Sequence, residues 1–187
     1  MNPADRRPRP GLDLRLLHAA RTGADRRPAL AGCGRALSLA GEHGAVWLLA
    51  GLAGAAADGA RRDAWLRATA LVAGAHLASM GVKRVVRRPR PALPGLEPLV
   101  RTAGRHSFPS SHAASSAAAA LAFHRLLPIA PTALLASAIC ASRLCVGVHY
   151  PSDVLAGALL GASGAALGRS WARGAGPAGV TDGWPDR

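Results

Sequence analysis

The chain has 187 residues, which suits one domain, and its formal net charge at pH 7 is +13. Half of the residues are hydrophobic and only 4% are aromatic, and the basic residues gather near the termini and in two internal clusters, 61–67 and 83–105. A nucleic-acid module would interleave basic and aromatic residues along one face, so the segregated charge favours a membrane protein, with a basic nucleic-acid binder as the less favoured alternative.

Residues 1–36 are predicted to form a basic N-terminal tail, whose Pro/Arg-rich first ten residues we expect to be disordered. Apolar residues then recur at helical spacing, namely Leu12, Leu16, Leu17 and Ala20. They predict an amphipathic helix in the membrane interface, with an ordinary surface helix as the alternative. We expect no signal peptide, because prolines and charged residues interrupt any apolar core here.

Five apolar segments follow, near residues 39–57, 64–82, 111–127, 130–148 and 152–171. A spanning helix needs about 20 mainly apolar residues, so the segments predict an all-α, polytopic membrane helix bundle with about five spanning helices plus the N-terminal interfacial helix. The membrane domain is expected over 37–172, and 173–187 is expected to be a flexible C-terminal tail.

Small and aromatic residues add detail to these segments. The last segment carries small residues at helical intervals, which favour close packing of helices: Gly157, Gly161, Ser163, Gly164 and Gly168. Three tryptophans, Trp47, Trp65 and Trp171, are expected to anchor segment ends at the interface. The cysteines, Cys33, Cys140 and Cys145, form no CxxC pair and are interpreted as core residues without a redox role.

Three short polar motifs interrupt this apolar background. The first is Lys83, six further residues, then Arg90 and Pro91; Lys83 is the only lysine in the chain. The second is Pro109-Ser110-Ser111-His112, where Ser is a favoured helix N-cap and the free backbone N–H groups form an anion site. By itself, this second motif is more often a plain helix cap than a site.

The third motif runs from Ser142-Arg143 through His149 to Asp153. Pro151 favours a helix start, which puts Asp153 in the first turn with its carboxylate facing back towards His149. A carboxylate on one imidazole nitrogen fixes the tautomer and frees the other as a nucleophile, although a structural His–Asp pair is the alternative. Asp153 is the only acidic residue between Glu97 and Asp182, which makes it costly in an apolar segment without a role.

Counting the predicted crossings brings the three motifs to one face of the membrane. Lys83, Arg90 and Arg143 would then form a cationic clamp for a phosphate. Neighbouring cations disfavour a metal at His112, His149 and Asp153, so we expect no metal ligand and no cofactor. Arg84, Arg87 and Arg88 are interpreted as lipid-headgroup contacts. Among the other histidines, His76 is expected to be a core hydrogen-bonding residue, and the rest are expected to be surface or interfacial: His18, His43, His106 and His124.

These motifs resemble the type 2 phosphatidic acid phosphatase family, which includes bacterial acid phosphatases and vanadium haloperoxidases. The family pattern is K-x6-RP, PSGH and SR-x5-H-x3-D, and the resemblance covers about residues 64–171; only Ser111 departs, standing where the family has Gly. The resemblance implies that His149 is the nucleophile forming a phosphohistidine, that Asp153 orients it and that His112 is the general acid. It further implies a set of residues that hold the phosphoryl oxygens, namely Lys83, Arg90, Ser110 and Arg143, while Ser111 would shape the pocket or add a donor.

The apolar segments favour the integral-membrane branch of this family. Together with these segments, the resemblance implies a metal-independent phosphatase that hydrolyses a lipid phosphomonoester or diphosphate, with phosphatidate, phosphatidylglycerol phosphate or a polyprenyl phosphate or diphosphate as substrate. Basic residues in the N-terminal tail predict an active site facing the cytoplasm of a multi-pass cell-membrane protein, a role similar to that of the polyprenyl-phosphoribose 5-phosphate phosphatases of actinobacteria. A non-catalytic phosphate-binding transporter or scaffold is the alternative. The sequence leaves open a homo-oligomer.

Overall fold

The computed structural model describes residues 11–102 and 104–172; the predicted disorder of residues 1–10 and the predicted tail 173–187 lie outside the described residues. The described residues are helical, without a strand, and a single β-bridge joins Pro89 and His106. The helices are α1 (Leu12–Asp25), α2 (Pro28–Ala40), the 3-10 turn η2 (Glu42–Gly44), α3 (Ala45–Ala57), the 3-10 turn η3 (Gly59–Arg61), α4 (Arg62–Val86), α5 (Ser111–Ala122), α6 (Ile129–Cys145), α7 (Pro151–Leu167) and α8 (Arg169–Ala172).

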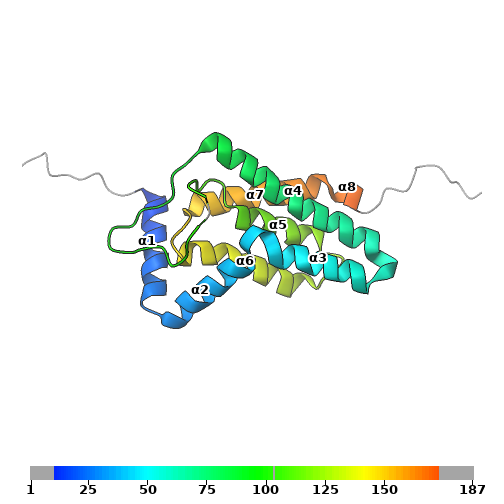
Figure 1. Cartoon of the computed structure of the whole chain (residues 1–187), viewed down its shortest axis with the longest axis horizontal. Coiled ribbons are helices and arrows are strands. Elements are labelled where there is room, and N and C mark those ends of the chain that lie inside the picture. Colours follow the sequence, from blue (N-terminus) through cyan, green and yellow to red (C-terminus); the bar gives the residue numbers. More distant parts are fainter. Residues whose placement is uncertain (1–10, 103, 173–187) are drawn as a thin grey trace, which may run out of the picture.

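Helices α3 to α7 run side by side, and α1 lies across one end of the bundle (Figure 1). From this end the chain runs through α2 and α3 to the far end, returns through α4, and then passes back and forth through α5, α6 and α7. The long loop 87–110, the start of α5 and the junction between α6 and α7 therefore share the end that α1 covers. This is the convergence of motifs that counting the crossings predicts.

Helix α5 is the centre of the bundle and packs against α4, α6 and α7. The α5–α7 contact depends on glycine: a Cβ at Gly157 would lie 2.3 Å from the carbonyl oxygen of Ser110, and one at Gly161 would lie 1.9 Å from that of Ala114. Two of the predicted small residues thus let the two backbones touch. Gly164 has open space around it and Gly168 faces Leu71 of α4, so these two do not serve that contact.

Two of the predicted interfacial tryptophans are buried, and for these the prediction is wrong. Trp47 is 2% exposed and its indole N–H donates to Ser116 Oγ at 3.0 Å. Trp65 is 5% exposed, donates to Asp58 Oδ2 at 3.2 Å and packs against Phe123 with ring centroids 5.7 Å apart. Each indole N–H finds a partner in the bundle, so the large rings fill the core that the small residues leave open. Trp171 is 51% exposed.

The apolar segment 39–57 is broken by η2, so α2 and α3 meet at an angle of 49°. His43 and Gly44 both have positive φ at this break, 53° and 74°. Together the two helices have the length and apolar composition of a membrane span, a test that no described helix passes by itself; Ile129–Cys145 and Pro151–Leu167 are apolar but shorter. The predicted first span is therefore not one straight helix. The break places Glu42 and His43 at the end of the bundle where the three motifs meet.

Candidate active site

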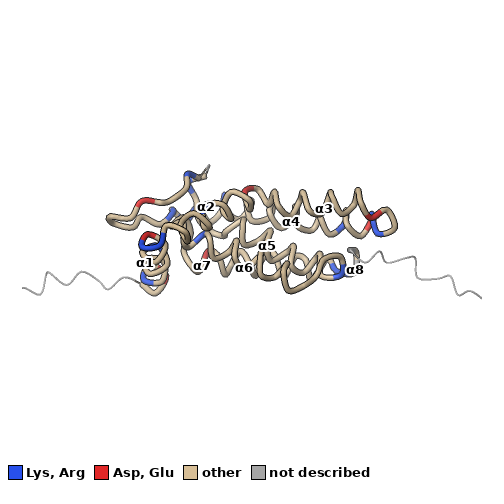
Figure 2. The backbone as a smooth tube through the Cα atoms, turned by 90° about the horizontal axis from the view of Figure 1, so that it is seen from below, with Lys and Arg blue, Asp and Glu red and all other residues tan. Residues whose placement is uncertain are grey.

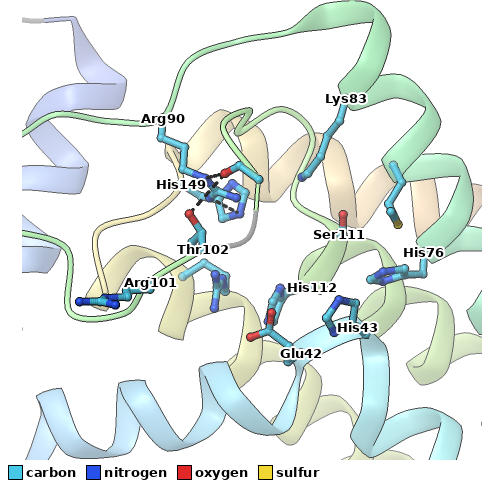
Figure 3. A pocket seen from close by; sticks show the side chains of 13 residues that line it. Glu42, His43, His76, Lys83, Arg90, Arg101, Thr102, Ser111, His112 and His149 are labelled. Atoms are coloured by element: carbon cyan, nitrogen blue, oxygen red, sulfur yellow. Dashed lines mark hydrogen bonds between the residues drawn. The ribbon is translucent and has the colours of Figure 1, made fainter.

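One cavity of about 160 Å³ opens at the end of the bundle where the motifs meet (Figure 3). Six of the eight residues predicted for the site line this cavity: Lys83, Arg90, Ser111, His112, Arg143 and His149. The other lining residues are Glu42, His43, His76, Met80, Arg101, Thr102 and Gly104. Asp153 is fully buried behind His149, and Ser110 is fully buried at the start of α5.

The pairing of His149 with Asp153 has the predicted local geometry. Helix α7 begins at Pro151, and Asp153 Oδ2 accepts from the backbone N–H of Tyr150 at 2.9 Å. His149 Nδ1 lies 3.5 Å from the same oxygen, which is ion-pair range, although Nδ1 makes no aligned hydrogen bond. Such long contacts in an empty site are common between catalytic groups, which tighten when substrate binds.

The other ring nitrogen of His149 faces Arg90. Arg90 Nη1 lies 3.5 Å from His149 Nε2 and donates to the carbonyl of Val148 at 3.0 Å. A guanidinium only donates, so Nε2 presents its lone pair towards the cavity and the ring proton resides on Nδ1, towards Asp153. Burial and the nearby charges of Arg143, Arg90 and Lys83 lower the pKa of His149 to about 4, although Asp153 opposes this shift. The ring is therefore neutral near pH 7.

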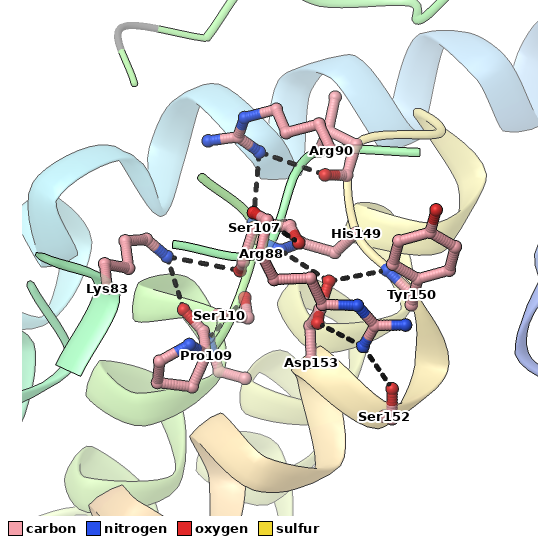
Figure 4. Close-up of polar contacts among 12 residues, drawn as sticks. Lys83, Arg88, Arg90, Ser107, Pro109, Ser110, His149, Tyr150, Ser152 and Asp153 are labelled. Carbon is pink, nitrogen blue, oxygen red and sulfur yellow. Dashed lines mark hydrogen bonds and ion pairs between the residues drawn. The ribbon is translucent and has the colours of Figure 1, made fainter. Parts of the chain in front are cut away.

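Lys83 is held over the segment that precedes α5 (Figure 4). Its Nζ donates to the carbonyl of Ser107 at 3.4 Å and to the carbonyl of Pro109. The loop itself is pinned where it turns back, because Ser107 N–H donates to the carbonyl of Arg88 at 2.8 Å. The single lysine thus reaches the cavity from the last turns of α4, as the first motif predicts.

Ser38 of α2 contacts two of the predicted site residues, His112 and Arg143. His112 Nε2 donates to the Ser38 carbonyl at 3.0 Å, and Arg143 Nη1 donates to Ser38 Oγ. Because a carbonyl only accepts, Nε2 of His112 carries a hydrogen, and Nδ1 remains for proton transfer. Sequence reasoning missed Ser38 because it lies at the edge of the predicted tail; Pro28, favourable at a helix start, and the apolar spacing after it were the available signal.

The two serines of the second motif have different positions. Ser110 is the N-cap of α5, as predicted, and its Oγ accepts from the N–H of Ala113 at 3.4 Å. Ser110 is not among the cavity-lining residues, so its contact with substrate stays a prediction. Ser111, the residue that stands where Gly is usual, does line the cavity and brings a hydroxyl to it.

Arg88 is half-buried and paired with carboxylates of the protein, so its interpretation as a lipid-headgroup contact is wrong. Its guanidinium donates to Asp153 Oδ1 at 2.8 Å and to Ser152 Oγ at 2.7 Å (Figure 4). It pairs with Asp13 of α1 at 3.0 Å. It also lies 4.0 Å from the ring centroid of Tyr150. Partial burial raises the pKa of Asp13, but hydrogen bonds from Ser152 and Arg88 outweigh it and lower that pKa. No local sequence signal distinguishes Arg88 from its arginine neighbours.

Two histidines and a glutamate form the remaining wall. His43 and His76 have ring centroids 6.1 Å apart, and both line the cavity together with Glu42. The prediction that His76 is a core hydrogen-bonding residue is wrong, because its Nδ1 is buried without a partner among the described residues. His43 is exposed, as expected, but towards the site. Glu42 and His43 lie far from His76 in the sequence, and the η2 break brings them beside it.

The arrangement is suited to an anion. Lys83, Arg90 and Arg143 surround one space, with the His149 lone pair on one side and His112 on another. Charge-assisted donors converging on such a space bind phosphate oxygens and stabilise charge that develops on them. Within residues 11–102 and 104–172, no group of three or more His, Cys, Asp or Glu side chains is placed to hold a metal ion.

The chain is similar in sequence to known proteins. The sequence profile of the PAP2 superfamily matches residues 64–176. The chain is 45% identical over 131 residues to the decaprenylphosphoryl-5-phosphoribose phosphatase of Mycolicibacterium smegmatis, covering 70% of this chain and 73% of that protein. It is 40% identical over 164 residues to the protein of the same name from Mycobacterium tuberculosis, covering 88% and 92%.

The fold has a solved counterpart. The crystal structure of a transmembrane PAP2-type phosphatidylglycerolphosphate phosphatase from Bacillus subtilis superimposes with a TM-score of 0.72, covering 89% of this chain and 87% of that one, at 23% identity. A shorter similarity, 37% identity over 101 residues, relates the chain to the lipid A 1-phosphatase of Rhizobium etli.

Proposed function

Because this chain belongs to the PAP2 superfamily, we propose that it is a membrane lipid phosphatase that works through a phosphohistidine at His149. The predictions of this family, of an all-helical fold and of a phosphatase are confirmed. The observation that carries the proposed mechanism is that His149 Nε2 faces Arg90 while Nδ1 faces Asp153. This orientation gives a neutral nucleophile whose other nitrogen faces a carboxylate 3.5 Å away.

In the first step, the Nε2 lone pair of His149 attacks phosphorus and the bond between phosphorus and the ester oxygen breaks. His112, protonated on both ring nitrogens in the substrate complex, gives its Nδ1 proton to the leaving oxygen, which departs as an alcohol. The ring of His149 becomes cationic, and Asp153 stabilises it through the proton on Nδ1. The cations around the cavity, Lys83, Arg90 and Arg143, hold the three phosphoryl oxygens through the transition state.

In the second step, water attacks the phosphohistidine. His112, now neutral, takes a proton from this water, and the bond between phosphorus and Nε2 breaks. The products are inorganic phosphate and the neutral His149, so the enzyme returns to its starting state. Neither of these two steps uses a metal ion.

The substrate we propose is a phosphomonoester on a polyprenyl-linked sugar, of the kind named for the two mycobacterial relatives. The extent of the similarity supports this choice, since 92% of the Mycobacterium tuberculosis protein is covered. The surface of the bundle supports a lipid environment: leucines in the middle of several helices are exposed, and Lys and Arg lie mainly towards the two ends (Figure 2). Examples are Leu49, Leu52, Leu77, Leu134, Leu155 and Leu159.

We further propose that the protein crosses the cell membrane several times with the cavity facing the cytoplasm. Helix α1 is tied to the cavity end by Asp13, whose carboxylate accepts from Ser152 N–H at 2.9 Å. Its arginines therefore lie with those of the loop 87–110, which gives this end an excess of basic residues. Such an excess is typical of the cytoplasmic side. Labelling a cysteine introduced at His18 tests this orientation, and labelling of intact cells from outside would contradict it.

Phosphate release by the purified full-length protein in detergent micelles tests the activity. We expect release from decaprenylphosphoryl-5-phosphoribose, with smaller rates from phosphatidylglycerol phosphate and undecaprenyl diphosphate. His149→Ala and His112→Ala should each lower the rate of phosphate release by several orders of magnitude. EDTA should leave the rate of the unmodified protein unchanged. Acid-labile incorporation of ³²P that depends on His149 would identify the intermediate.

Binding of phosphate without release from any of these lipids would instead favour the transporter or scaffold alternative. Loss of activity in EDTA, restored by a divalent cation, would contradict the metal-independent mechanism. If His149→Ala were as active as the unmodified protein, His149 would not be the nucleophile, although the family assignment would stand.

A further inference from the structure

We propose that Glu42, His43 and His76 form a subsite that binds the hydroxyl groups of a sugar leaving group. This inference rests on the proposed phosphatase activity and adds to it the part of the cavity that selects the substrate. It assigns a role to the three residues that the phosphate-transfer steps do not use.

The subsite lies where the leaving group must be. In an in-line displacement the leaving oxygen departs on the side opposite the nucleophile, beside the group that protonates it. In Figure 3, His149 and Arg90 lie on one side of the cavity, and His112 lies towards the other side with Glu42, His43 and His76. Whatever is attached to the departing oxygen therefore meets these three side chains first.

The chemistry of this wall matches hydroxyl groups. Glu42 is the one carboxylate among the described residues that line the cavity, and it has no ion pair within 4.0 Å among the described residues. A carboxylate repels the phosphate itself but is a strong acceptor for sugar hydroxyls. Its position at the leaving-group end thus separates the anion-binding half of the cavity from a hydroxyl-binding half.

The two imidazoles extend the same surface. Their ring centroids are 6.1 Å apart and the rings are tilted by 46°, which leaves room for different hydroxyls on each. His76 Nδ1 is buried and has no hydrogen-bond partner among the described residues. A buried polar atom without a partner is costly, and a hydroxyl in the cavity would satisfy it. Ser111 adds another hydroxyl to the cavity lining close by (Figure 3).

The backbone supports a functional reason for this arrangement. His43 has φ of 53°, a left-handed conformation that is uncommon for residues with a Cβ. The next residue, Gly44, has φ of 74° and a built Cβ would lie 3.3 Å from Ser115 Cβ. The η2 break therefore directs a histidine into the cavity through a sparsely populated backbone conformation, and such conformations cluster at ligand-binding positions.

An isoprenoid or a plain alkyl leaving group would gain nothing from this wall and would leave its polar atoms unpaired. Sites built to hydrogen-bond hydroxyl groups discriminate strongly against analogues that lack them. The inferred ligand class is thus a phosphomonoester of a polyhydroxylated sugar.

Two amphiphiles test the subsite in mixed micelles with the purified full-length protein. One is a dodecyl riboside carrying a 5-phosphate, and the other is a dodecyl pentyl ether carrying a terminal phosphate; they share the chain and the primary phosphomonoester and differ in the ring and its hydroxyls. We expect kcat/KM to favour the riboside by about tenfold or more. Glu42→Gln and His43→Asn should each lower this preference by about tenfold, and Asn tolerates the left-handed backbone at position 43.

Matched controls lie outside the cavity. Glu97→Gln and His18→Asn change the same residue types at exposed positions and should leave the preference as it is in the unmodified protein. Equal kcat/KM for the two amphiphiles, or an equal loss on both in Glu42→Gln and His43→Asn, would overturn the subsite while leaving the phosphatase intact. Hydrolysis of neither amphiphile, nor of decaprenylphosphoryl-5-phosphoribose, would overturn the proposed function and this inference with it.

Discussion

Arg88 binds the buried carboxylate of Asp153 directly, with Nη1 2.8 Å from Oδ1. The same guanidinium pairs with Asp13 of α1 through Nη2, at 3.0 Å. The N-terminal helix is therefore connected to His149 through two carboxylates and one arginine. Because Asp153 has no exposed surface, its orientation depends on these partners.

Arg88→Gln should lower kcat by about tenfold to a hundredfold, the range for loss of a hydrogen bond to a charged group. Arg88 acts through Asp153, so Arg88→Lys, which keeps the charge but not the fork of donors, should restore part of the rate. Steady-state kinetics with the lipid substrate measure both variants. Arg84→Gln, at an exposed position on α4, is the control. Equal rates in Arg88→Gln and Arg88→Lys would argue against a positioning role.

His149 should titrate near pH 4, well below an ordinary histidine, because burial and the cations around it disfavour the protonated ring. A lowered pKa means that the nucleophile stays neutral as the pH falls, until about 4. NMR titration of the ring in micelles measures this, with His149→Asn to assign the signal. In Arg90→Gln the pKa should rise, since one repelling charge is removed. A midpoint near 6.5 in both proteins would contradict the role of the cations.

Gly41→Ala should displace His112, because a Cβ at this position would lie 2.8 Å from His112 Cδ2 and 2.9 Å from Ile139 Cγ2. We expect kcat to fall by at least about tenfold, since general acid catalysis contributes about 10²–10⁴-fold and depends on position. Gly32→Ala is the matched control on α2, because nothing lies within 4 Å of a Cβ there. Unchanged kinetics in Gly41→Ala would show that His112 is not held by this contact.

Gly161→Ala should destabilise the bundle, because its Cβ would lie 1.9 Å from the carbonyl oxygen of Ala114, which is backbone and cannot turn away. Overpacking of this kind costs about 1–3 kcal/mol or more. Gly164→Ala, one turn further along α7 with open space around it, should be neutral or stabilising by up to about 1 kcal/mol. Thermal unfolding in detergent compares the two variants. Similar melting temperatures would refute close α5–α7 packing.

Much of the site could be predicted from local patterns. The helix starts at Ser111 and Pro151 follow from N-cap and N1 preferences, which act within a few residues of the chain. Asp153 faces His149 because it lies in the first turn of α7, which begins at Pro151. The apolar segments gave α4 to α7 within a few residues, apart from the early end of α5 at Ala122, where the chain turns before Pro128.

What the sequence by itself determined, then, is the family, the helical class and the residues of the three motifs, since each depends on spacing along one stretch of chain. The tertiary structure decided which of several similar side chains serve the site. Arg88 differs from Arg87 only in what lies opposite it, Ser38 bonds His112 and Arg143 from α2, and Glu42 and His76 line the cavity from positions outside the three motifs. Their roles come from the break at η2 and from α1 and α2 folding over the cavity end, contacts between distant segments that no local preference encodes.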